Sequence, residues 1–215
     1  MGENVAYFDV LDADQLRIRA QEHGRNHNQT PHIDYVDENG DLSIISDKFD
    51  LVFSSHCIEH QVDFIKHLDQ VANILTETGE CWMIIPDKNY CFDHYFDTSS
   101  IADILDARIS GRNVHSLKSL VEHSCLITHN DALRHWLGDH GVKNASLTKM
   151  SVQNAISKFD VADGQYIDVH AWQFTPQSFL ELMQLLYELG LSRFSTVMVN
   201  STPFPRQEFT VRLGL

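Results

Sequence analysis

Residues Phe49–Tyr90, FDLVFSSHCIEHQVDFIKHLDQVANILTETGECWMIIPDKNY, predict one strand–helix–strand unit. Asp50–Ser54 and Cys81–Ile85 are short apolar runs of the kind that form buried strands. Between them, Val62–Leu75 carries apolar residues at helical spacing, and Thr78-Gly79 is expected to close this helix. Unbroken apolar runs are typical of parallel strands that are buried on both faces. The stretch therefore indicates an α/β sheet.

Polar side chains follow both apolar runs at the point where each run ends. The carboxyl ends of parallel strands meet at one edge of a sheet, and ligands of open α/β sheets bind there. We therefore expect a functional site at this edge. Its candidate residues are Ser54, Ser55, His56, Glu59 and His60 after the first run, and Pro86, Asp87 and Lys88 after the second.

Shorter patterns on both sides of this unit predict the rest of the sheet. Two strands are expected upstream and an antiparallel pair downstream, over Val5–Phe8, Ile33–Val36, Phe194–Val199 and Glu208–Leu213. A helix over Asp14–His23 and a polar loop over His23–Thr30 lie between the upstream strands. Before the final pair, Pro176–Leu189 predicts a helix that Thr175 begins as N-cap and Gly190 ends.

The pattern changes between the two strand-rich regions. Helical periodicity recurs over Ile101–Ile109 and Leu117–Leu126, and no strand-like run interrupts it. We interpret residues 86–170 as a helical cap inserted over the ligand edge of the sheet. With 215 residues, the chain can bury a sizeable core as a single domain over residues 1–215.

Composition and charge exclude several classes of protein. The formal net charge of -14 argues against nucleic acid or an anionic membrane as the main partner. No apolar run approaches the roughly 20 residues of a membrane span, and the N-terminus has no signal-peptide core. The four cysteines show no C-x-x-C spacing, which favours free thiols in a reducing cytosol. We expect a cytoplasmic protein with a small-molecule substrate.

Separated segments of the chain resemble class I S-adenosylmethionine-dependent methyltransferases. Residues 49–60 (FDLVFSSHCIEH) and 75–93 (LTETGECWMIIPDKNYCFD) resemble the fourth and fifth strands of that fold in a bacterial subgroup. The subgroup has Ser-His-x-x-Glu-His and Pro-Asp-Lys-x-Tyr-x-Phe-Asp segments. Residues 168–176 (DVHAWQFTP) resemble a later motif of the subgroup, and 5–17 (VAYFDVLDADQLR) its second strand and following helix. The resemblance implies a Rossmann-like methyltransferase sheet, with the helical cap inserted after the fifth strand.

One part of the family pattern is missing from this sequence. In that fold the first strand ends in a glycine-rich turn that approaches the cofactor closely. This sequence begins at Met1-Gly2-Glu3, directly before the predicted second strand, and its 10 glycines include no Gly-x-Gly. We therefore interpret the fold as N-terminally truncated, and we expect S-adenosylmethionine to bind weakly or not at all.

A missing central strand would leave buried backbone groups without partners, so neighbouring segments must supply them. We expect the strand at Val5–Phe8 to pair directly with Asp50–Ser54, which keeps Asp9 beside Ser55 and His56. Homo-oligomerisation across a remaining sheet edge is the alternative.

Asp9 is the strongest candidate for cofactor binding. An acidic residue at the end of the second strand accepts hydrogen bonds from ribose hydroxyls, and Asp9 matches that position of the family. The alternative is that Asp9 helps to start the following helix. Asp37 is placed to meet the adenine amino group, or it serves the turn at Asn39-Gly40. Ser55 and His56 are the two other residues that we predict to bind the cofactor.

The 13 histidines invite a metal interpretation. His56 and His60 have the spacing of four that can clamp zinc, with Glu59 between them. His56 follows a buried strand directly, so the helix is only beginning there. We therefore favour a role for His56, Glu59 and His60 in capping the start of the helix, and we predict no metal site. A further group is interpreted as solvated residues of the cap: His123, His129, His135 and His140.

His170 and His60 are the candidate catalytic residues. Methyl transfer to oxygen or nitrogen requires that the acceptor lose a proton, and an imidazole can serve as the general base. The alternative for His170 is a hydrogen-bonding role at the hinge of the cap, beside Trp172 and Phe174 as packing residues. The candidate substrate contacts are Asp87, Lys88 and Asp93.

Two functions from different classes remain. The first is methyl transfer from S-adenosylmethionine to a small molecule, such as a sugar or a cell-surface precursor. The second is a non-catalytic relative that serves as an interaction or assembly module. The polar edge of the sheet favours the first, and the missing turn favours the second. A metal-dependent hydrolase is a distant third.

Overall fold

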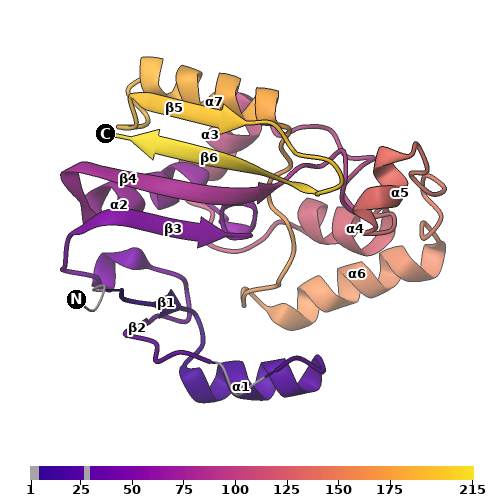
Figure 1. Cartoon of the computed structure of the whole chain (residues 1–215). Coiled ribbons are helices and arrows are strands. Elements are labelled where there is room, and N and C mark those ends of the chain that lie inside the picture. Colours follow the sequence, from indigo (N-terminus) through magenta and orange to yellow (C-terminus); the bar gives the residue numbers. More distant parts are fainter. Residues whose placement is uncertain (1–4, 27–29) are drawn as a thin grey trace. The chain divides into compact units, whose positions relative to one another are not determined.

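The computed structural model describes residues 5–26 and 30–215 (Figure 1). The chain forms two compact units, Met1–Lys48 (unit 1) and Phe49–Leu215 (unit 2). Met1-Gly2-Glu3 and part of the polar loop predicted over His23–Thr30 lie outside the described residues.

Unit 1 holds two short parallel strands and one helix. β1 (Phe8–Asp9) pairs with β2 (Tyr35–Val36), and α1 (Ala13–Glu22) lies between them in the chain. A 3₁₀ turn, η2 (Leu42–Ile44), follows β2. The helix and β2 occur where the sequence predicts them, whereas β1 shares only Phe8 with the predicted strand Val5–Phe8; each strand has 2 residues.

The predicted pairing of Val5–Phe8 with Asp50–Ser54 is wrong. Phe8 pairs in register with Tyr35, and the four-stranded sheet of unit 2 does not include β1. Two parallel strands need a crossover of a dozen or more residues, and residues 10–34 supply one that contains α1. A local partner therefore satisfies the backbone groups of β1.

Unit 2 contains a four-stranded sheet in the order β3-β4-β6-β5 (Figure 1). β3 (Phe49–Ser55) and β4 (Leu75–Pro86) are parallel, and α2 (Phe64–Ile74) connects them. β6 (Glu208–Gly214) runs antiparallel to both β4 and β5 (Thr196–Asn200). The predicted strand–helix–strand unit and the antiparallel terminal pair are therefore confirmed.

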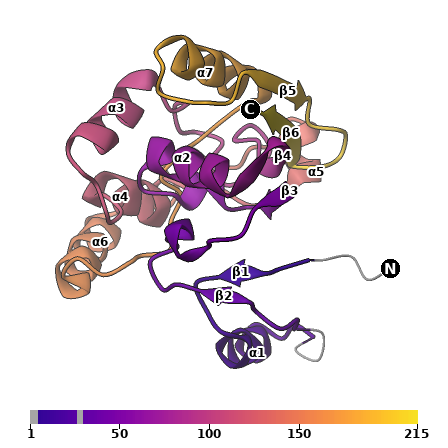
Figure 2. The same cartoon turned by 90° about the vertical axis from the view of Figure 1, so that its left-hand side faces the viewer.

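Helices α2 and α7 (Pro176–Glu188) cover one face of this sheet (Figure 2). They meet in a cluster of aromatic rings, in which Phe64 of α2 contacts Phe179 of α7 at 6.2 Å between ring centroids. Phe179 in turn contacts Phe209 of β6 at 5.9 Å. Trp172 packs on Phe64 and is 1% exposed, which confirms it as a packing residue.

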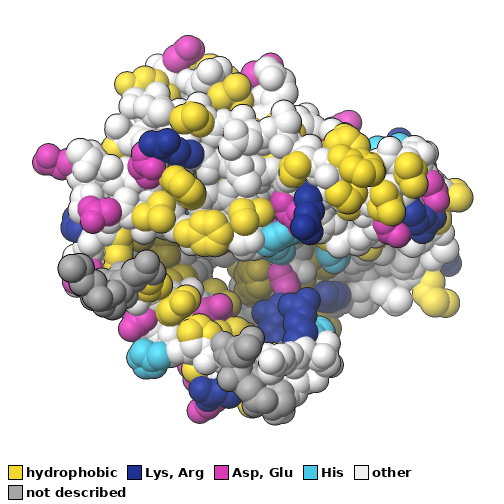
Figure 3. Space-filling model, viewed as in Figure 1, with side chains coloured by type: hydrophobic (Ala, Val, Ile, Leu, Met, Phe, Trp, Pro, Cys, Tyr) yellow, Lys and Arg dark blue, Asp and Glu magenta, His cyan; other side chains and the backbone are white. Residues whose placement is uncertain are grey.

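The opposite face of the sheet carries exposed hydrophobic side chains (Figure 3). Leu51 and Phe53 of β3 are 50% and 60% exposed, and Trp82 of β4 is 45% exposed. The prediction that these strands are buried on both faces is therefore wrong. Its physical reason is that, within the described part of unit 2, α2 and α7 pack on a single side of the sheet.

Residues 87–173, all of which the structure describes, contain helices and no strand. The helices are α3 (Ile101–Ile109), α4 (Leu117–Cys125), α5 (Ala132–Trp136) and α6 (Lys149–Ala162). The two predicted helical patches, at 101–109 and 117–126, are confirmed. A small core between α4 and α6 consists of Leu120, Cys125, Ala155, Ile167 and Val169. Among the described residues, no helix combines the length and the apolar character needed to cross a membrane.

The boundary between α2 and β4 differs from the prediction. α2 ends at Ile74 and β4 begins at Leu75, so Gly79 lies within the strand and does not close the helix. A β-carbon on Gly79 would lie 2.9 Å from the carbonyl oxygen of Phe49. Glycine is needed here because the backbones of β3 and β4 approach closely.

His67 of α2 gives the fold a measurable dependence on pH. Its side chain is buried, and burial lowers its pKa from 6.5 to about 4. Unfolding exposes the imidazole, so between these two pH values the unfolded state binds one proton more than the folded state. We expect the free energy of unfolding to fall as the pH drops from 6.5 toward 4, by about 3 kcal/mol for this residue.

Urea unfolding at pH 7 and at about pH 4.5 measures this dependence. The His67→Gln variant should lose much less stability between the two pH values than the unchanged protein. His23→Gln, at an exposed position after α1, is the control and should behave like the unchanged protein. Equal pH dependence in all three proteins would contradict the assignment to His67.

Candidate active site at the carboxyl ends of β3 and β4

β3 and β4 end at the same edge of the sheet, as predicted. Ser55 pairs with Ile84, and the His56 amide donates to the Ile84 carbonyl at 3.0 Å. His56 then adopts a left-handed backbone conformation (φ 50°) and turns the chain into a 3₁₀ helix, η3 (Ile58–His60). The N-cap of α2 is Asp63, so the predicted capping role of His56 and His60 is wrong. Strained backbone of this kind clusters at functional sites.

His170 and Asp93 form a buried pair beside this edge. His170 Nδ1 donates to Asp93 Oδ2 at 2.5 Å. The ring of His60 meets that of His170 edge to face, with 4.7 Å between centroids. The backbone amides of residues 171 and 172 fix this arrangement, because they donate to the Glu59 carbonyl at 2.7 and 3.1 Å. The two predicted catalytic histidines are therefore neighbours.

The side chain of Glu59 is enclosed in this site. The residue is 0% exposed, and within the described chain neither of its carboxylate oxygens has a hydrogen-bond partner. Glu59 Oε1 lies 3.4 Å from His56 Nδ1 and 3.9 Å from His60 Nε2. Burying a carboxylate without hydrogen bonds is costly. Such a group is typical of a site whose ligand supplies hydrogen-bond donors.

Acidic neighbours favour the protonated forms of two site histidines. The contact with Glu59 raises the pKa of His56, and Glu208, 3.5 Å from His56 Nε2, adds to this effect. Burial lowers the pKa of His60, but Asp168 and Glu59 outweigh burial, so the pKa is raised. Asp168 Oδ1 lies 3.2 Å from His60 Nδ1.

The three predicted substrate contacts have protein partners. Asp87 is buried and accepts a hydrogen bond from the Thr202 hydroxyl at 2.7 Å, and burial raises its pKa. Lys88 Nζ donates to the His94 carbonyl at 3.1 Å, and burial lowers its pKa. Asp93 Oδ2 accepts the hydrogen bond from His170. Its other oxygen, Oδ1, has no hydrogen-bond partner among the described residues.

The two predicted cofactor carboxylates lie together in unit 1. Asp9 ends β1 and Asp37 follows β2, and the Asp37 amide donates to the Asp9 carbonyl at 3.3 Å. Asp9 Oδ1 accepts the amide of Leu11, at the entry to α1. Asp37 Oδ1 accepts the amides of Asn39 and Asp41, which is turn chemistry. Among the described residues, none donates to the second oxygen of either carboxylate.

A second group of histidines lies in the helical segment. The prediction that these histidines are solvated is wrong for His135, which is 2% exposed. The rings of His129, His94 and His140 surround it at centroid distances of 4.2, 5.2 and 5.3 Å. Spacing along the chain could not show this cluster, because His94 comes from the loop after β4 and the others from the segment around α5.

Two sets of side chains have the geometry to hold a cation. Glu59, His60 and His170 form one set, and a second consists of His94, His135 and His140. Within each set, the ligand atoms all lie within 4.8 Å of one another. Neither set was predicted from the sequence, from which we expected no metal site.

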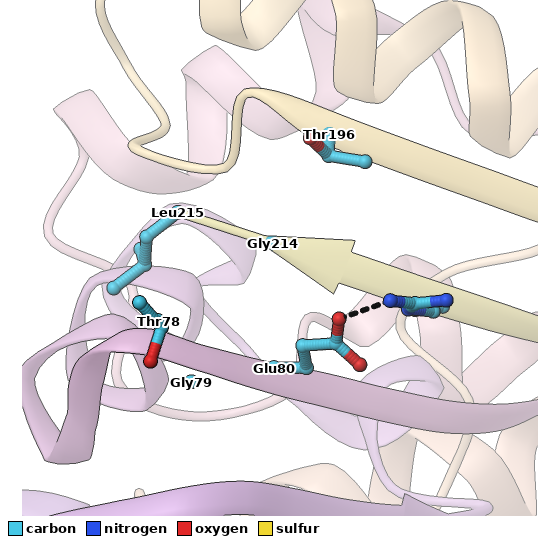
Figure 4. A pocket seen from close by; sticks show the side chains of 7 residues that line it. Thr78, Gly79, Glu80, Thr196, Gly214 and Leu215 are labelled. Carbon is cyan, nitrogen blue, oxygen red and sulfur yellow. Dashed lines mark hydrogen bonds and ion pairs between the residues drawn. The ribbon is translucent and has the colours of Figure 1, made fainter.

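A pocket at the other end of β4 has different chemistry (Figure 4). It is lined by residues 78–80 of β4, by Thr196 and by residues at the end of β6, and an ion pair between Glu80 and Arg212 joins two of its walls. Ligands of parallel strands bind at the carboxyl end, and this pocket lies at the amino end. The polar edge therefore remains the candidate site.

Residues 3–83 match the methyltransferase domain family. No curated protein matches the chain. Among solved structures, the chain is similar to a putative O-methyltransferase from Nostoc punctiforme PCC 73102, with 14% identity and a TM-score of 0.42. That similarity covers 99% of this chain and 45% of the other, so the chain spans less than half of that protein. The α/β sheet with its antiparallel terminal pair matches a Rossmann-like methyltransferase fold, and the family match over residues 3–83 agrees with it.

Proposed function

We propose that the protein transfers a methyl group from S-adenosylmethionine to a hydroxyl or amine of a small molecule. The observation that carries this proposal is the buried set formed by Glu59 and the His170–Asp93 pair. It combines a free acceptor of hydrogen bonds with an imidazole that a carboxylate orients. The match of residues 3–83 to a methyltransferase domain supports the same class of reaction.

In this reaction, His170 accepts the proton that the attacking hydroxyl or amine loses. Asp93 holds the Nδ1 proton of His170, which leaves the lone pair of Nε2 for the incoming proton. Glu59 accepts a hydrogen bond from the methyl acceptor and holds it near His170. His60 packs edge to face against His170 and restricts the movement of its ring.

The described residues fit the nucleoside end of the methyl donor. Asp9 and Asp37 follow adjacent parallel strands, and each keeps one oxygen that can accept from a ribose hydroxyl or from the adenine amino group. Ser55 and His56 of unit 2 remain a separate prediction for cofactor contact, which rests on the sequence alone. When bound, S-adenosylmethionine supplies an electrophilic methyl group.

The acceptor that we favour is a polyhydroxyl compound, such as a sugar or a cell-surface precursor. Both oxygens of Glu59 and Oδ1 of Asp93 are buried acceptors without described partners. Sugar hydroxyls can donate hydrogen bonds to all three. The net charge of -14 disfavours nucleic acid as the acceptor.

Calorimetric titration with S-adenosylmethionine and S-adenosylhomocysteine tests this proposal. Because the sequence has no Gly-x-Gly turn, we expect weak binding, and the titration therefore extends to millimolar ligand. Asp9→Ala should abolish the heat of binding. Asp14→Ala, which changes an exposed carboxylate in α1, is the control and should leave the heat unchanged. If neither ligand gives heat, the alternative of a non-catalytic interaction or assembly module is favoured.

A further inference from the structure

Three histidines from distant parts of the chain come together in unit 2. His94 follows β4, His135 lies in α5, and His140 lies in the loop after α5. His135 Nδ1 and His140 Nδ1 are 3.0 Å apart, and the rings of His94 and His140 stack at 3.8 Å between centroids. Tetrahedral zinc, with Zn–N distances of about 2.0–2.1 Å, holds ligand nitrogens about 3.3 Å apart. The ligand nitrogens are therefore close enough for zinc, and rotation of the stacked His94 and His140 rings would direct their lone pairs to one point.

Backbone carbonyls determine which nitrogen carries the proton in two of these rings. His94 Nδ1 donates to the Asn89 carbonyl at 2.8 Å, and His135 Nε2 donates to the His129 carbonyl at 3.0 Å. His94 Nε2 and His135 Nδ1 therefore keep their lone pairs. Metal-binding histidines show the same arrangement, in which the second nitrogen donates to a carbonyl or carboxylate.

His129 lies in the same cluster but differs from the other three. Its Nδ1 accepts the amide of Asp131 at 3.2 Å, and its Nε2 donates to the carbonyl of Asp139 at 2.9 Å. Both nitrogens are used by the backbone, so His129 has no lone pair left for a metal.

The segment that carries His135 and His140 has almost no hydrophobic core. Between residues 126 and 154, all of which are described, His135 is the only buried residue. Several large apolar side chains of this segment are exposed, namely Leu133, Leu137, Val142 and Leu147. Segments that cannot bury an apolar core are often stabilised by a bound metal instead.

We propose that His94, His135 and His140 bind a zinc ion that ties residues 126–148 to the loop after β4. Three imidazoles suit zinc better than magnesium or calcium, which prefer oxygen ligands. A water molecule would complete the tetrahedral coordination. Because Asp93 precedes His94, the ion would also fix the loop that presents Asp93 to His170. This inference does not depend on the proposed methyl transfer.

Zinc binding to the full chain tests the proposal. The protein is first stripped of metal with a chelator and is then titrated with zinc chloride against a chromophoric competitor. We expect one zinc ion per chain and a rise in melting temperature when zinc is added. His94→Gln and His140→Gln should each weaken zinc affinity by about tenfold or more. His129→Gln is the matched control within the cluster and should bind zinc as the unchanged protein does.

The variants also separate this site from the other candidate set. Only His135 of the cluster is buried, so His94→Gln and His140→Gln are chosen because they should preserve the fold. Absence of zinc binding in the unchanged protein would reduce the cluster to a hydrogen-bond network and overturn the proposal. Zinc that survives both substitutions but is lost in Glu59→Gln would also overturn it, because the ion would then lie at Glu59.

Discussion

Replacement of His170 by alanine is expected to lower the turnover number about 10²–10⁴-fold, the usual contribution of a general base. Without the imidazole that Asp93 holds at 2.5 Å, the acceptor has no group to take its proton. The KM for the acceptor should change little, because we assign acceptor binding to Glu59. Release of S-adenosylhomocysteine, measured with the best acceptor from a panel of sugars, gives both constants, and a thermal melt of each variant gives its stability.

Asp93→Asn tests the positioning role of the carboxylate. An amide in its place no longer stabilises the charged ring, so turnover should fall by a similar factor. Added imidazole should restore part of the activity of His170→Ala, a rescue that a structural role would not produce. The ring of Phe92 contacts His170 at 4.7 Å and His123 at 5.6 Å between centroids, so His123→Gln is the matched control and should keep its activity. Unchanged turnover together with a lowered melting temperature in His170→Ala would assign His170 to the hinge of the helical segment.

Local features of this fold can be predicted from the sequence. The apolar stripe over Val62–Leu75 predicts α2, and the Thr175-Pro176 pair predicts where α7 begins. These patterns suffice because a helix is defined by residues three and four apart and by the group that caps it. Short apolar runs likewise predict β3 and β4, the two strands that the polar residues follow.

Features that depend on distant contacts could not be predicted in this way. An apolar run such as Leu51–Phe53 does not reveal whether one or two faces of its strand are covered, because that depends on which helices pack there. The partner of β1 was missed for a similar reason. We expected β1 to fill the gap that a missing central strand would leave beside Asp50–Ser54. The connection over residues 10–34 is long enough to place β2 parallel to β1, and β2 is the observed partner.

The candidate site shows both cases. His60 and His170 were predicted from their positions beside a strand end and before a helix, and they are neighbours in the structure. The isolation of Glu59 could not be predicted, because it depends on how residues 171 and 172 dock against its backbone. The only signal in the sequence is that Glu59 lies between two histidines at the end of a buried strand. The burial of His135 likewise depends on a loop that precedes it by many residues.

Replacement of Glu59 by methionine is expected to stabilise the fold by about 1–3 kcal/mol and to raise the KM for the acceptor. The buried carboxylate lacks hydrogen-bond partners among the described residues, so an apolar side chain of similar length removes a cost. Gains in stability on removal of a functional group are known where a site is built for its ligand. Asp87→Ala is the matched control: Asp87 is also buried at this edge, but Thr202 and a backbone amide donate to it. Its loss should destabilise the fold by about 1–3 kcal/mol.

The stability difference between Glu59→Met and the unchanged protein should depend on pH. His56 and His60 have raised pKa values, so they keep their protons to a higher pH than an ordinary histidine does. At about pH 6 both are largely protonated, and their charges offset part of the cost of burying Glu59. At about pH 8.5 that compensation is weaker, so Glu59→Met should stabilise the fold more at pH 8.5 than at pH 6. A loss of stability in Glu59→Met at pH 8.5 would mean that the carboxylate supports the fold. Acceptor binding would then need another group, because the proposal rests on a carboxylate that the protein itself leaves without hydrogen bonds.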